Sequence, residues 1–180
     1  EGLAAVAKKD ANDNLKWGFI NPQGKLVIPM QFDDVSYITY DTYGFDQGLA
    51  PVSKNGKYGY IDKTGKTVID FNYEYAGNFS NGLAPVRQNE KLMYINHAGK
   101  TVFTVPYDDA ASFSEGLAVV AKQGKFGYID TKGKLVIPIQ FNLDEGDSID
   151  SYRFSHGHAK LFKNGKPFCI NTSGKTVVCR

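Results

Sequence analysis

The sequence has no excess of charge and no long apolar run, and both shortages narrow the range of functions. Its 21 lysines and arginines and 19 acidic residues give a formal net charge of +2. The lysines are spread singly, whereas a chain that binds nucleic acid gathers its basic residues on one face or stripe. No stretch approaches the roughly 18 apolar residues that a membrane span needs. We therefore expect no nucleic-acid binding and no membrane insertion.

Signatures of catalysis are also missing. The sequence contains no phosphate-binding glycine loop, no serine nucleophile elbow and no Cys-x-x-Cys pair. We therefore predict no enzymatic activity, no cofactor and no metal. No helical periodicity persists for more than one turn, so the pattern favours an all-β chain. Because the chain begins without methionine and inside a repeat, we expect a processed or trimmed product.

What the chain does contain is a motif that occurs five times. The motif is an aromatic-Gly-aromatic-Ile-Asp/Asn segment, followed by a turn that ends in Gly-Lys. Its isoleucine recurs in steps of 41, 34, 34 and 41 residues, at Ile20, Ile61, Ile95, Ile129 and Ile170. Self-similarity at a fixed period is typical of repeat architectures, in which each copy is one supersecondary unit.

Two further markers divide the chain into units. Gly-Leu-Ala or a variant opens each unit, and an aromatic followed by acidic and small residues closes it. The units are approximately 1–46, 47–80, 81–114, 115–155 and 156–180, within a single predicted domain of residues 1–180. The longer steps come from extra residues in two insertions, 36–47 and 142–156. Because insertions map to loops on one side of a repeat array, that side is the candidate functional face.

The second unit shows the strands expected in each copy. Asn55-Gly56 between apolar stretches is a strong hairpin signal, because both residues tolerate positive φ. Lys63-Thr64-Gly65 predicts a second, bulge-type turn. Pro51 predicts that the first strand is an edge, or that its proline nitrogen points away from the ladder. Gly59 in the second strand predicts the close approach of another backbone or ring.

A meander of three or four short strands cannot bury its apolar side alone, whereas stacked copies can. We predict an all-β fold of five tandem three- to four-stranded β-meander repeats, stacked as an open solenoid-like array. The alternative is a five-bladed β-propeller, in which the first and last units close a ring. The open array is favoured because 34 residues are few for a four-stranded blade.

In these motifs the chain resembles the bacterial WG-repeat family. Trp17-Gly18 is the literal WG pair, and the third and fifth copies have Met93 and Phe168 in place of the glycine. The resemblance spans nearly the whole chain and implies a β-repeat module of a bacterial protein, often exported or fused to other domains, without catalytic residues to carry over. We assign to the structural core of the repeat Trp17, Gly18, Ile20, Gly59, Ile61, Ile95, Gly127, Ile129 and Ile170.

Repeated aromatic rings are one candidate surface. One equivalent position carries Trp17, Tyr58 and Phe126, and another carries Phe19, Tyr60, Tyr94 and Tyr128. Such rows either stack on sugars or form the core between repeats, and we favour the core because the rings recur with the fold. Four tyrosines of the insertions are not explained by the repeat, and we predict that they are exposed contact residues: Tyr37, Tyr40, Tyr43 and Tyr152.

Two polar clusters are candidates for ion binding. Asp144 and Asp147 lie in an acidic insertion whose carboxylates are of the type that binds Ca²⁺, although the spacing does not match an EF-hand loop. We favour a solvated loop that contributes contact residues. His156 and His158 share one face of a strand and are a candidate metal pair. A diverged terminal repeat is the favoured interpretation.

The two cysteines, Cys169 and Cys179, both lie in the last unit. With the predicted turn, Cys169 faces Val177 and Cys179 is its diagonal neighbour. Diagonal positions are roughly 7–8 Å apart, at or beyond the usual disulfide limit, so a bridge requires local bending. Both cysteines replace other residues of the repeat, and we predict a disulfide that staples the terminal unit. A disulfide predicts a periplasmic or extracellular protein; the alternative is a cytoplasmic one.

These observations together predict a non-enzymatic repeat scaffold that binds another macromolecule, foremost a protein, through insertions 36–47 and 142–156. The first alternative is a carbohydrate or cell-envelope binding module that uses the repeated rings. The second is a metal site or enzyme built in the insertions.

Overall fold

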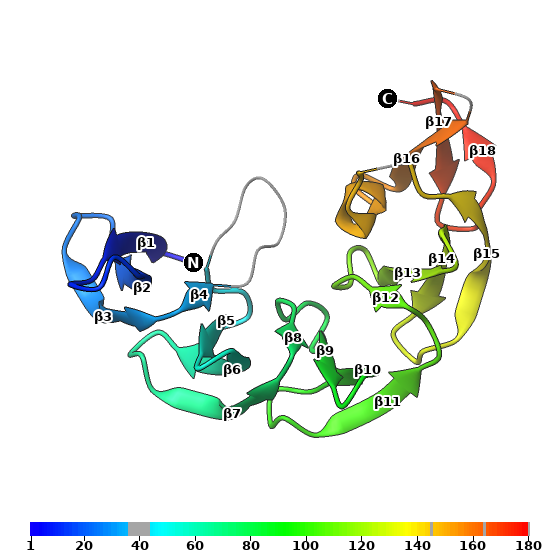
Figure 1. The fold of residues 1–180 in the computed structure, drawn as a ribbon. Coiled ribbons are helices and arrows are strands. Elements are labelled where there is room, and N and C mark those ends of the chain that lie inside the picture. Colours follow the sequence, from blue (N-terminus) through cyan, green and yellow to red (C-terminus); the bar gives the residue numbers. More distant parts are fainter. Residues whose placement is uncertain (36–43, 145, 164, 180) are drawn as a thin grey trace.

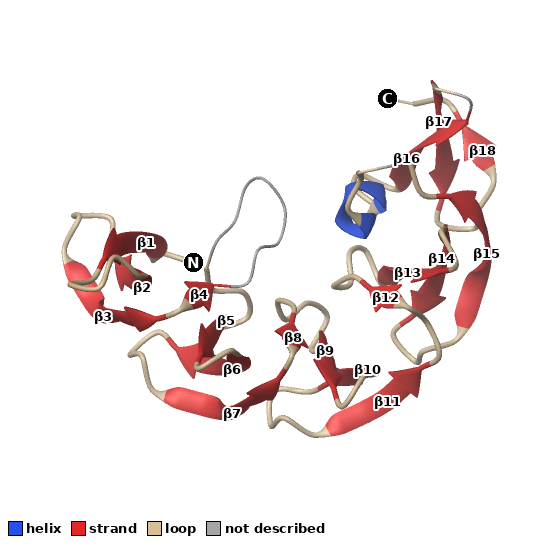
Figure 2. Cartoon of the chain, in the orientation of Figure 1, coloured by secondary structure: helices blue, strands red, loops and turns tan. Residues whose placement is uncertain are grey.

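The computed structural model describes residues 1–35, 44–144, 146–163 and 165–179 (Figure 1). Almost all of the regular structure is β (Figure 2). The strands are β1 (Ala4–Lys9), β2 (Leu15–Ile20), β3 (Leu26–Phe32), β4 (Asp34–Val35), β5 (Leu49–Lys54), β6 (Lys57–Asp62), β7 (Thr67–Tyr73), β8 (Tyr75–Ala76), β9 (Ala84–Gln88), β10 (Lys91–Ile95), β11 (Thr101–Val105), β12 (Asp109–Ala110), β13 (Leu117–Lys122), β14 (Lys125–Asp130), β15 (Leu135–Asn142), β16 (His158–Lys163), β17 (Lys166–Asn171) and β18 (Thr176–Val177). A short 3₁₀ helix, η1 (Ile149–Tyr152), precedes β16.

The strands form five antiparallel sheets in tandem. The three middle sheets have four strands each, in the orders β4-β5-β6-β7, β8-β9-β10-β11 and β12-β13-β14-β15. The end sheets, β1-β2-β3 and β16-β17-β18, have three. The short first strand of each middle sheet comes from the segment that closes the preceding motif; Tyr75 and Ala76, for example, pair with Arg87 and Val86. Each closing segment therefore completes the next sheet.

The five sheets follow one another in an open arc (Figure 1). The short strands β4, β8 and β12 lie on the inner side of the arc together with η1. The last strands of the first four sheets, β3, β7, β11 and β15, lie on the outer side. The first and last sheets stand apart at the opening of the arc. This confirms the predicted open array, and the described residues do not close a five-bladed ring.

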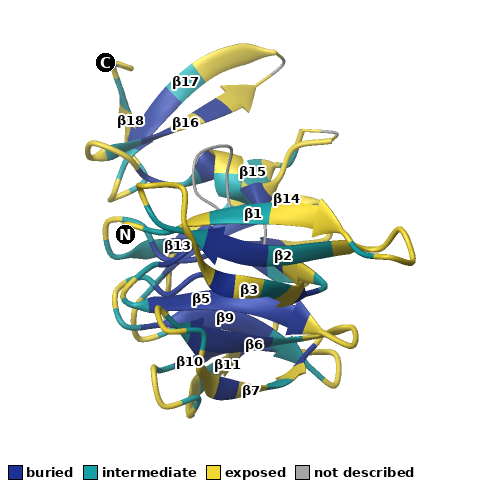
Figure 3. Ribbon diagram, turned by 90° about the vertical axis from the view of Figure 1, so that its left-hand side faces the viewer, coloured by how far each residue is buried: buried dark blue, intermediate teal, exposed yellow. Residues whose placement is uncertain are grey.

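Each hydrophobic cluster joins two consecutive sheets. The cluster between the second and third sheets, for example, includes Tyr60 and Ile69 of one and Val86 and Ile95 of the other. Corresponding clusters lie at the other three junctions. Burial of apolar surface is worth roughly 25 cal/mol per Å², and here it is available only when neighbours stack. The middle strands β5, β6 and β9 are accordingly buried, whereas β1 and much of β16 are exposed (Figure 3).

The motif glycine permits a close backbone approach within its own sheet, as predicted. A Cβ on Gly59 would lie 2.7 Å from the carbonyl oxygen of Ile69. The ladder explains this contact: Tyr58 pairs with Tyr73 and Tyr60 pairs with Ile69, so β7 bulges opposite the glycine. The third copy lacks the glycine and pairs regularly at Met93. The glycine and the bulge therefore occur together.

The predicted turns are confirmed. Asn55 and Gly56 have φ values of 53° and 74°, as a tight hairpin requires. In the second turn, the Gly65 amide donates to the Asp62 carbonyl oxygen at 2.9 Å, and the Asp62 carboxylate accepts from the amides of Thr64 and Lys66. The same side-chain bonds recur at Asn21, Asn96, Asp130 and Asn171. They account for the Asp or Asn that ends each motif.

The glycine of the Gly-Lys turn has a second role, at the junction between units. A Cβ on Gly65 would lie 3.1 Å from the Ile28 side chain of the preceding sheet. Gly99 meets Ile69 in the same way, and Gly133 meets Phe103 at 2.7 Å. The turn of each unit therefore packs against the third strand of the unit before it.

Pro51 is accommodated by the second of the predicted arrangements. Its strand β5 is not an edge, because it lies between β4 and β6. However, β4 pairs only with Ser53 and Val52, so it ends before it reaches the proline. The proline nitrogen thus faces no ladder partner among the described residues.

Candidate functional site

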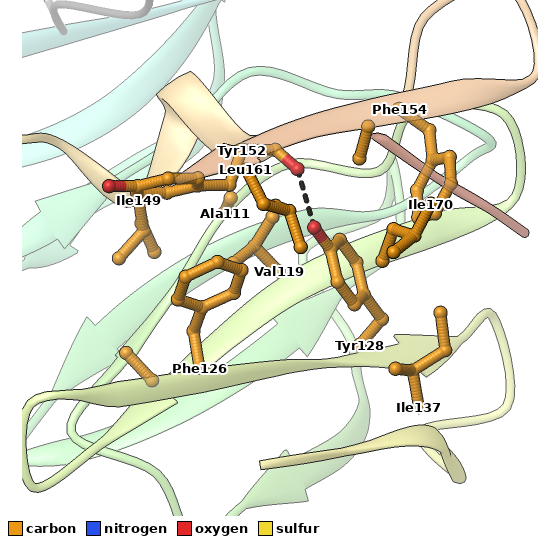
Figure 4. Packing of buried hydrophobic residues seen from close by; sticks show 12 residues of the cluster. Ala111, Val119, Phe126, Tyr128, Ile137, Ile149, Tyr152, Phe154, Leu161 and Ile170 are labelled. Atoms are coloured by element: carbon orange, nitrogen blue, oxygen red, sulfur yellow. Dashed lines mark hydrogen bonds between the residues drawn. The ribbon is translucent and has the colours of Figure 1, made fainter. Parts of the chain in front are cut away.

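The second row of rings lies inside the core. Phe19, Tyr60, Tyr94 and Tyr128 are all 0 % exposed. The three tyrosine hydroxyls donate to carbonyl oxygens of the following inner segment: Tyr60 to Gly77 at 2.7 Å, Tyr94 to Ala111 at 2.7 Å and Tyr128 to Tyr152 at 2.8 Å. Figure 4 shows the bond of Tyr128. Burial raises the pKa of Tyr60 and Tyr94 well above the usual value, so both donate as neutral phenols. These rings hold units together and present no stacking surface.

The first row of rings is more mixed. Phe126 is fully buried, whereas Trp17 and Tyr58 are half-buried. The Tyr58 hydroxyl donates to the Asp34 carboxylate at 2.6 Å. Burial, and then this carboxylate, raise the pKa of Tyr58. Tyr58 therefore links β6 to the short inner strand β4.

Insertion 142–156 folds against the fourth sheet, and the predicted exposure of Tyr152 is wrong. Tyr152 lies in η1, is 1 % exposed and stacks on Phe126 with ring centroids 4.3 Å apart. Its hydroxyl donates to the Asp147 carboxylate at 2.8 Å and accepts from the Asp144 amide at 3.2 Å. The three predicted residues are thus brought together, with Asp144 and Asp147 exposed and Tyr152 beneath them.

Of insertion 36–47, the structure describes residues 44–47. Tyr37, Tyr40 and Tyr43 lie outside the described residues. Phe45 packs on Phe19 with centroids 5.0 Å apart, which anchors this end in the first junction.

Side chains just before Gly-Leu-Ala link consecutive units. Glu1 accepts from the Gly48 amide, and Gln47 accepts from the Gly82 amide, both at 3.0 Å. Glu115 accepts from the Gly157 amide at 2.9 Å. Sequence reasoning missed these bonds. The sequence feature that could have indicated them is the side-chain oxygen that recurs just before Gly-Leu-Ala, at Glu1, Gln47 and Glu115.

The inner strands place polar groups at equivalent positions. Asp34 in β4, Tyr75 in β8 and Asp109 in β12 correspond to one another in the repeat. Burial raises the pKa of Tyr75, and the nearby carboxylates of Asp150 and Asp109 add to this effect. Burial also raises the pKa of Asp150, while the Arg153 guanidinium acts in the opposite direction. Tyr75, Asp109 and Asp150 are therefore close enough to interact electrostatically on the inner side.

A polar pocket of about 350 Å³ collects residues from both insertions. Asp46 and Gln47 come from the first insertion and Arg153 from the second, and the middle units contribute Asn78, Phe79, Ser80, Ser112, Phe113, Ser114 and Glu115. Asn78 is 3 % exposed and donates its amide N–H to the Asp46 carboxylate. Its Oδ1 is buried without a hydrogen-bond partner within the part of the chain that the structure describes. A buried acceptor without a partner destabilises the fold, so a ligand donor that enters the pocket and bonds to it removes this cost.

The histidine pair makes local contacts. The Ser155 hydroxyl lies 2.9 Å from Nδ1 of His156, and Nδ1 of His158 lies 3.2 Å from the His156 carbonyl oxygen. Across residues 1–35, 44–144, 146–163 and 165–179, no group of three His, Cys, Asp or Glu side chains is arranged to hold a metal ion.

Cys169 and Cys179 form a disulfide, with Cα atoms 5.2 Å apart. Cys169 pairs with Val177 as predicted, but β18 ends at Val177. The chain then leaves the ladder, which brings Cys179 closer than a diagonal neighbour in a regular sheet. Among the described residues, no helix is long and apolar enough to cross a membrane.

Comparisons with known proteins agree with this geometry. The family model described as WG containing repeat matches residues 17–58, 58–91, 93–126 and 126–166. No curated protein matches the chain. A solved structure described as a crystal structure of the eukaryotic initiation factor aligns with a TM-score of 0.50 and 13% identity, over 99% of this chain and 52% of that chain. The chain thus spans about half the length of that protein, and at this identity the likeness shows the fold alone.

Proposed function

The chain belongs to the WG containing repeat family, and from this premise we propose that it is a non-enzymatic scaffold that binds another protein. The proposed contact surface is the inner side of the arc, with insertions 36–47 and 142–156 as its variable parts. Repeat arrays commonly bind on such extended concave surfaces. The insertions interrupt an otherwise regular period, so they are the parts of the surface that the fold itself does not require.

One observation carries the proposal: residues of both insertions and of the units between them line the same polar pocket. The pocket offers the Oδ1 of Asn78, which has no hydrogen-bond partner among the described residues, and the carboxylates of Asp46 and Glu115. These acceptors suit a side chain with several donors, such as a lysine or arginine of the partner. Arg153 at the same pocket suits an acceptor beside that side chain.

Rigid display is the proposed mechanism. The pocket lies on stacked sheets that are linked by the Gln47 and Glu115 bonds to the next unit. A surface that is ordered before binding loses less conformational freedom on association, which favours affinity. We propose that the disulfide places the protein in an oxidising compartment, periplasmic or extracellular, of a bacterial cell.

The test uses a deletion that the repeat itself suggests. Removal of residues 37–43 joins Ser36 to Gly44 and restores the 34-residue spacing of the middle units. We expect the deleted protein to fold, and to lose the proteins that the intact chain captures from a cell-envelope extract. In calorimetry, a purified captured protein should bind the intact chain at least about tenfold more tightly than it binds the deleted chain. This is a difference of about 1.4 kcal/mol in binding free energy.

The matched control is Val102→Thr on the outer side, which should leave capture unchanged. Equal binding by the intact and the deleted chain would contradict the proposed contact surface. Binding on a glycan array, abolished by Tyr58→Ala, would favour the carbohydrate alternative instead.

A further inference from the structure

The first strand of the last sheet has a free edge. In the three middle sheets, the first strands β5, β9 and β13 each lie between the second strand and a short inner strand. In the last sheet, β16 pairs only with β17 among the described residues. The backbone N–H and C=O groups on the other side of such a strand are able to bond to an added strand.

The middle sheets show which backbone group of this edge receives the inner strand. The Asp108 amide donates to the Ala121 carbonyl oxygen at 2.8 Å, and the Asp33 amide donates to the Ser53 carbonyl oxygen at 2.9 Å. An offset of 41 residues aligns the fifth unit with the fourth, so Phe162 is the counterpart of Ala121. The Phe162 carbonyl oxygen is therefore the acceptor that an inner strand would use in the last sheet.

Phe162 is accessible at this edge. Its ladder partner on β17 is Pro167, which has no N–H to donate to it. Phe162 is 38 % exposed, whereas its counterparts Ser53 and Ala121 are each 4 % exposed. The last sheet is thus open at the residue that the inner strand covers in the middle sheets.

Insertion 142–156 accounts for the free edge. Asn142 stands at the position of Asp108 but remains in β15. Counted back from the next Gly-Leu-Ala position, the counterparts of β12 are residues 150–151, and these lie in η1. The fourth unit therefore supplies a short helix where the other units supply a strand.

A pocket of about 1100 Å³ lies beside this edge. Gln140, Phe141 and Asn142 at the end of β15 line one side, and Phe162, Lys163 and Gly165 of the β16–β17 hairpin line another. In the middle junctions, the closing segment crosses from the end of one sheet to the hairpin of the next. The pocket thus occupies the place of that crossing.

The acidic residue of a closing segment bonds to the next hairpin. The Glu74 carboxylate accepts from the amides of Asn89 and Glu90, and it forms an ion pair with Lys57 at 3.3 Å. In the last unit, Gly165 is the counterpart of Glu90 and lines the pocket. A strand that brings an acidic residue to β16 would place it beside the same part of the hairpin.

Lysines at this edge select among possible strands. Lys160 and Lys163 lie on β16 and Lys166 opens β17, and none of the three forms an ion pair with a carboxylate in the described ranges. Lys163 and Lys166 line the pocket with one described carboxylate, Asp144. Lysine on an edge disfavours pairing with an apolar or basic strand. An acidic strand is therefore favoured over β16 of a second copy.

The hairpin of β1, the other first strand without an inner partner among the described residues, differs. There the Asp10 carboxylate accepts from the amides of Asn12 and Asn14 at 2.8 and 3.0 Å. Because this turn is capped from within, an acidic residue of an added strand would have no such role. The internal pattern therefore fits β16 and not β1.

We propose that the free edge of β16 binds an extended peptide segment of a partner protein, with an acidic residue followed two positions later by alanine or valine. Asp33 to Val35, Glu74 to Ala76 and Asp108 to Ala110 have this pattern. The peptide adds to the sheet as its inner strand, antiparallel to β16. The pocket beside the edge shares no lining residue with the polar pocket of the proposed function, so neither proposal depends on the other.

The probe is a fluorescein-labelled peptide with the sequence of residues 105–112, Val-Pro-Tyr-Asp-Asp-Ala-Ala-Ser. We expect saturable binding in fluorescence polarisation. In ¹⁵N-labelled protein, the amide shifts should be confined to β16 and to residues 165 and 166. A peptide with asparagine in place of both aspartates should bind about fivefold more weakly, because it loses charge-assisted bonds.

N-methylation of the peptide tests the backbone pairing itself. A methyl group on the nitrogen that corresponds to Asp108 removes the donor to Phe162, and should weaken binding by about tenfold. The matched control carries the methyl group at the counterpart of Ala110. In β12 the Ala110 amide donates to the Asp109 carboxylate and not to β13, so the control should keep its affinity.

The matching change in the protein is Phe162→Pro, which removes the outward N–H and obstructs the edge. Because first strands of this repeat already carry Pro51 and Pro85, we expect this variant to fold, which circular dichroism checks. It should lose the peptide by at least about tenfold. Val102→Thr on the outer side is the control and should bind normally. If Phe162→Pro unfolds, the two methylated peptides still decide the question on the intact chain.

Equal affinity of the two methylated peptides would overturn the proposal, and so would amide shifts centred on β1. Dimerisation of the unliganded chain that excludes the peptide would assign the edge to a second copy and contradict it as well. The chain that lacks residues 37–43 should bind the peptide as the intact chain does, so this proposal and the proposed function fail separately.

Discussion

The middle sheets and the last sheet occupy the same repeat but are stabilised differently. In the middle sheets, a buried tyrosine donates to a carbonyl of the following segment, and the next sheet covers it. In the last sheet, Cys169 takes that position, is 0 % exposed and is bonded to Cys179. A unit with a neighbour on each side gains stability from packing, whereas a terminal unit lacks one neighbour. The disulfide can replace part of the stabilisation that packing against a missing neighbour would give.

The motif glycine shows the same contrast. Gly127 in the fourth unit lies against the backbone of β15, and a Cβ there would be 2.5 Å from the Ile137 carbonyl oxygen. The fifth unit has Phe168 at this position, half-buried, and β17 pairs with β18 without a register shift. The bulge opposite this position is therefore a property of the units that keep the glycine, whereas the register shift one residue later also occurs in the third unit.

The largest expected effect follows from placing alanine at this position in both units. Gly127→Ala forces a methyl group against backbone atoms that cannot rotate away, so we expect a loss of roughly 3 kcal/mol in unfolding free energy. Phe168→Ala removes a half-buried ring and should cost about 1 kcal/mol. Urea denaturation followed by circular dichroism measures both. Equal losses would show that the close approach at Gly127 is relieved by a small backbone shift.

An intermediate effect is expected from loss of the disulfide. Cys169→Ala/Cys179→Ala should cost about 2 kcal/mol, near the lower end for disulfides because the closed loop is short. The loss should be local, since repeat arrays unfold from their ends. Hydrogen exchange should therefore lose amide protection in β16–β18 while β5–β7 remain protected. Loss of protection in β5–β7 to the same extent would contradict a separate role for the bond at the end of the array.

The smallest effect concerns the buried hydroxyl groups. Tyr94→Phe leaves the Ala111 carbonyl oxygen without its donor, at an expected cost of about 1 kcal/mol. Phe19 shows that the position itself accepts phenylalanine. The matched control is Val102→Thr on an exposed strand, which should change stability by less than about 0.5 kcal/mol. A Tyr94→Phe protein as stable as the control would indicate that water replaces the hydroxyl.

Much of the fold could be predicted because the chain repeats. The hairpin at Asn55-Gly56 and the motif glycines depend on contacts within one unit. Because the unit recurs five times, the sequence gives several independent copies of the same local pattern. The disulfide was predicted because both cysteines depart from the repeat. The geometry of the disulfide could not be predicted, because no feature of the repeat pattern indicates that β18 ends at Val177.

The insertions were harder to predict, since no second copy constrains them. Tyr152 was expected on the surface, but its ring fills space over Phe126, 26 residues earlier in the chain. His156 and His158 were noticed as a pair.

The turn glycines that pack on the preceding unit also have a geometric consequence. Contacts such as that of Gly99 with Ile69 fix how far each sheet tilts from the last, and the tilts add up along the chain. The width of the opening between the first and last sheets of the arc therefore depends on how many copies are stacked. Duplicating residues 81–114, the copy that contains no residue of either insertion, would narrow or close that opening. The side chains of the first and last sheets on either side of it would stay the same.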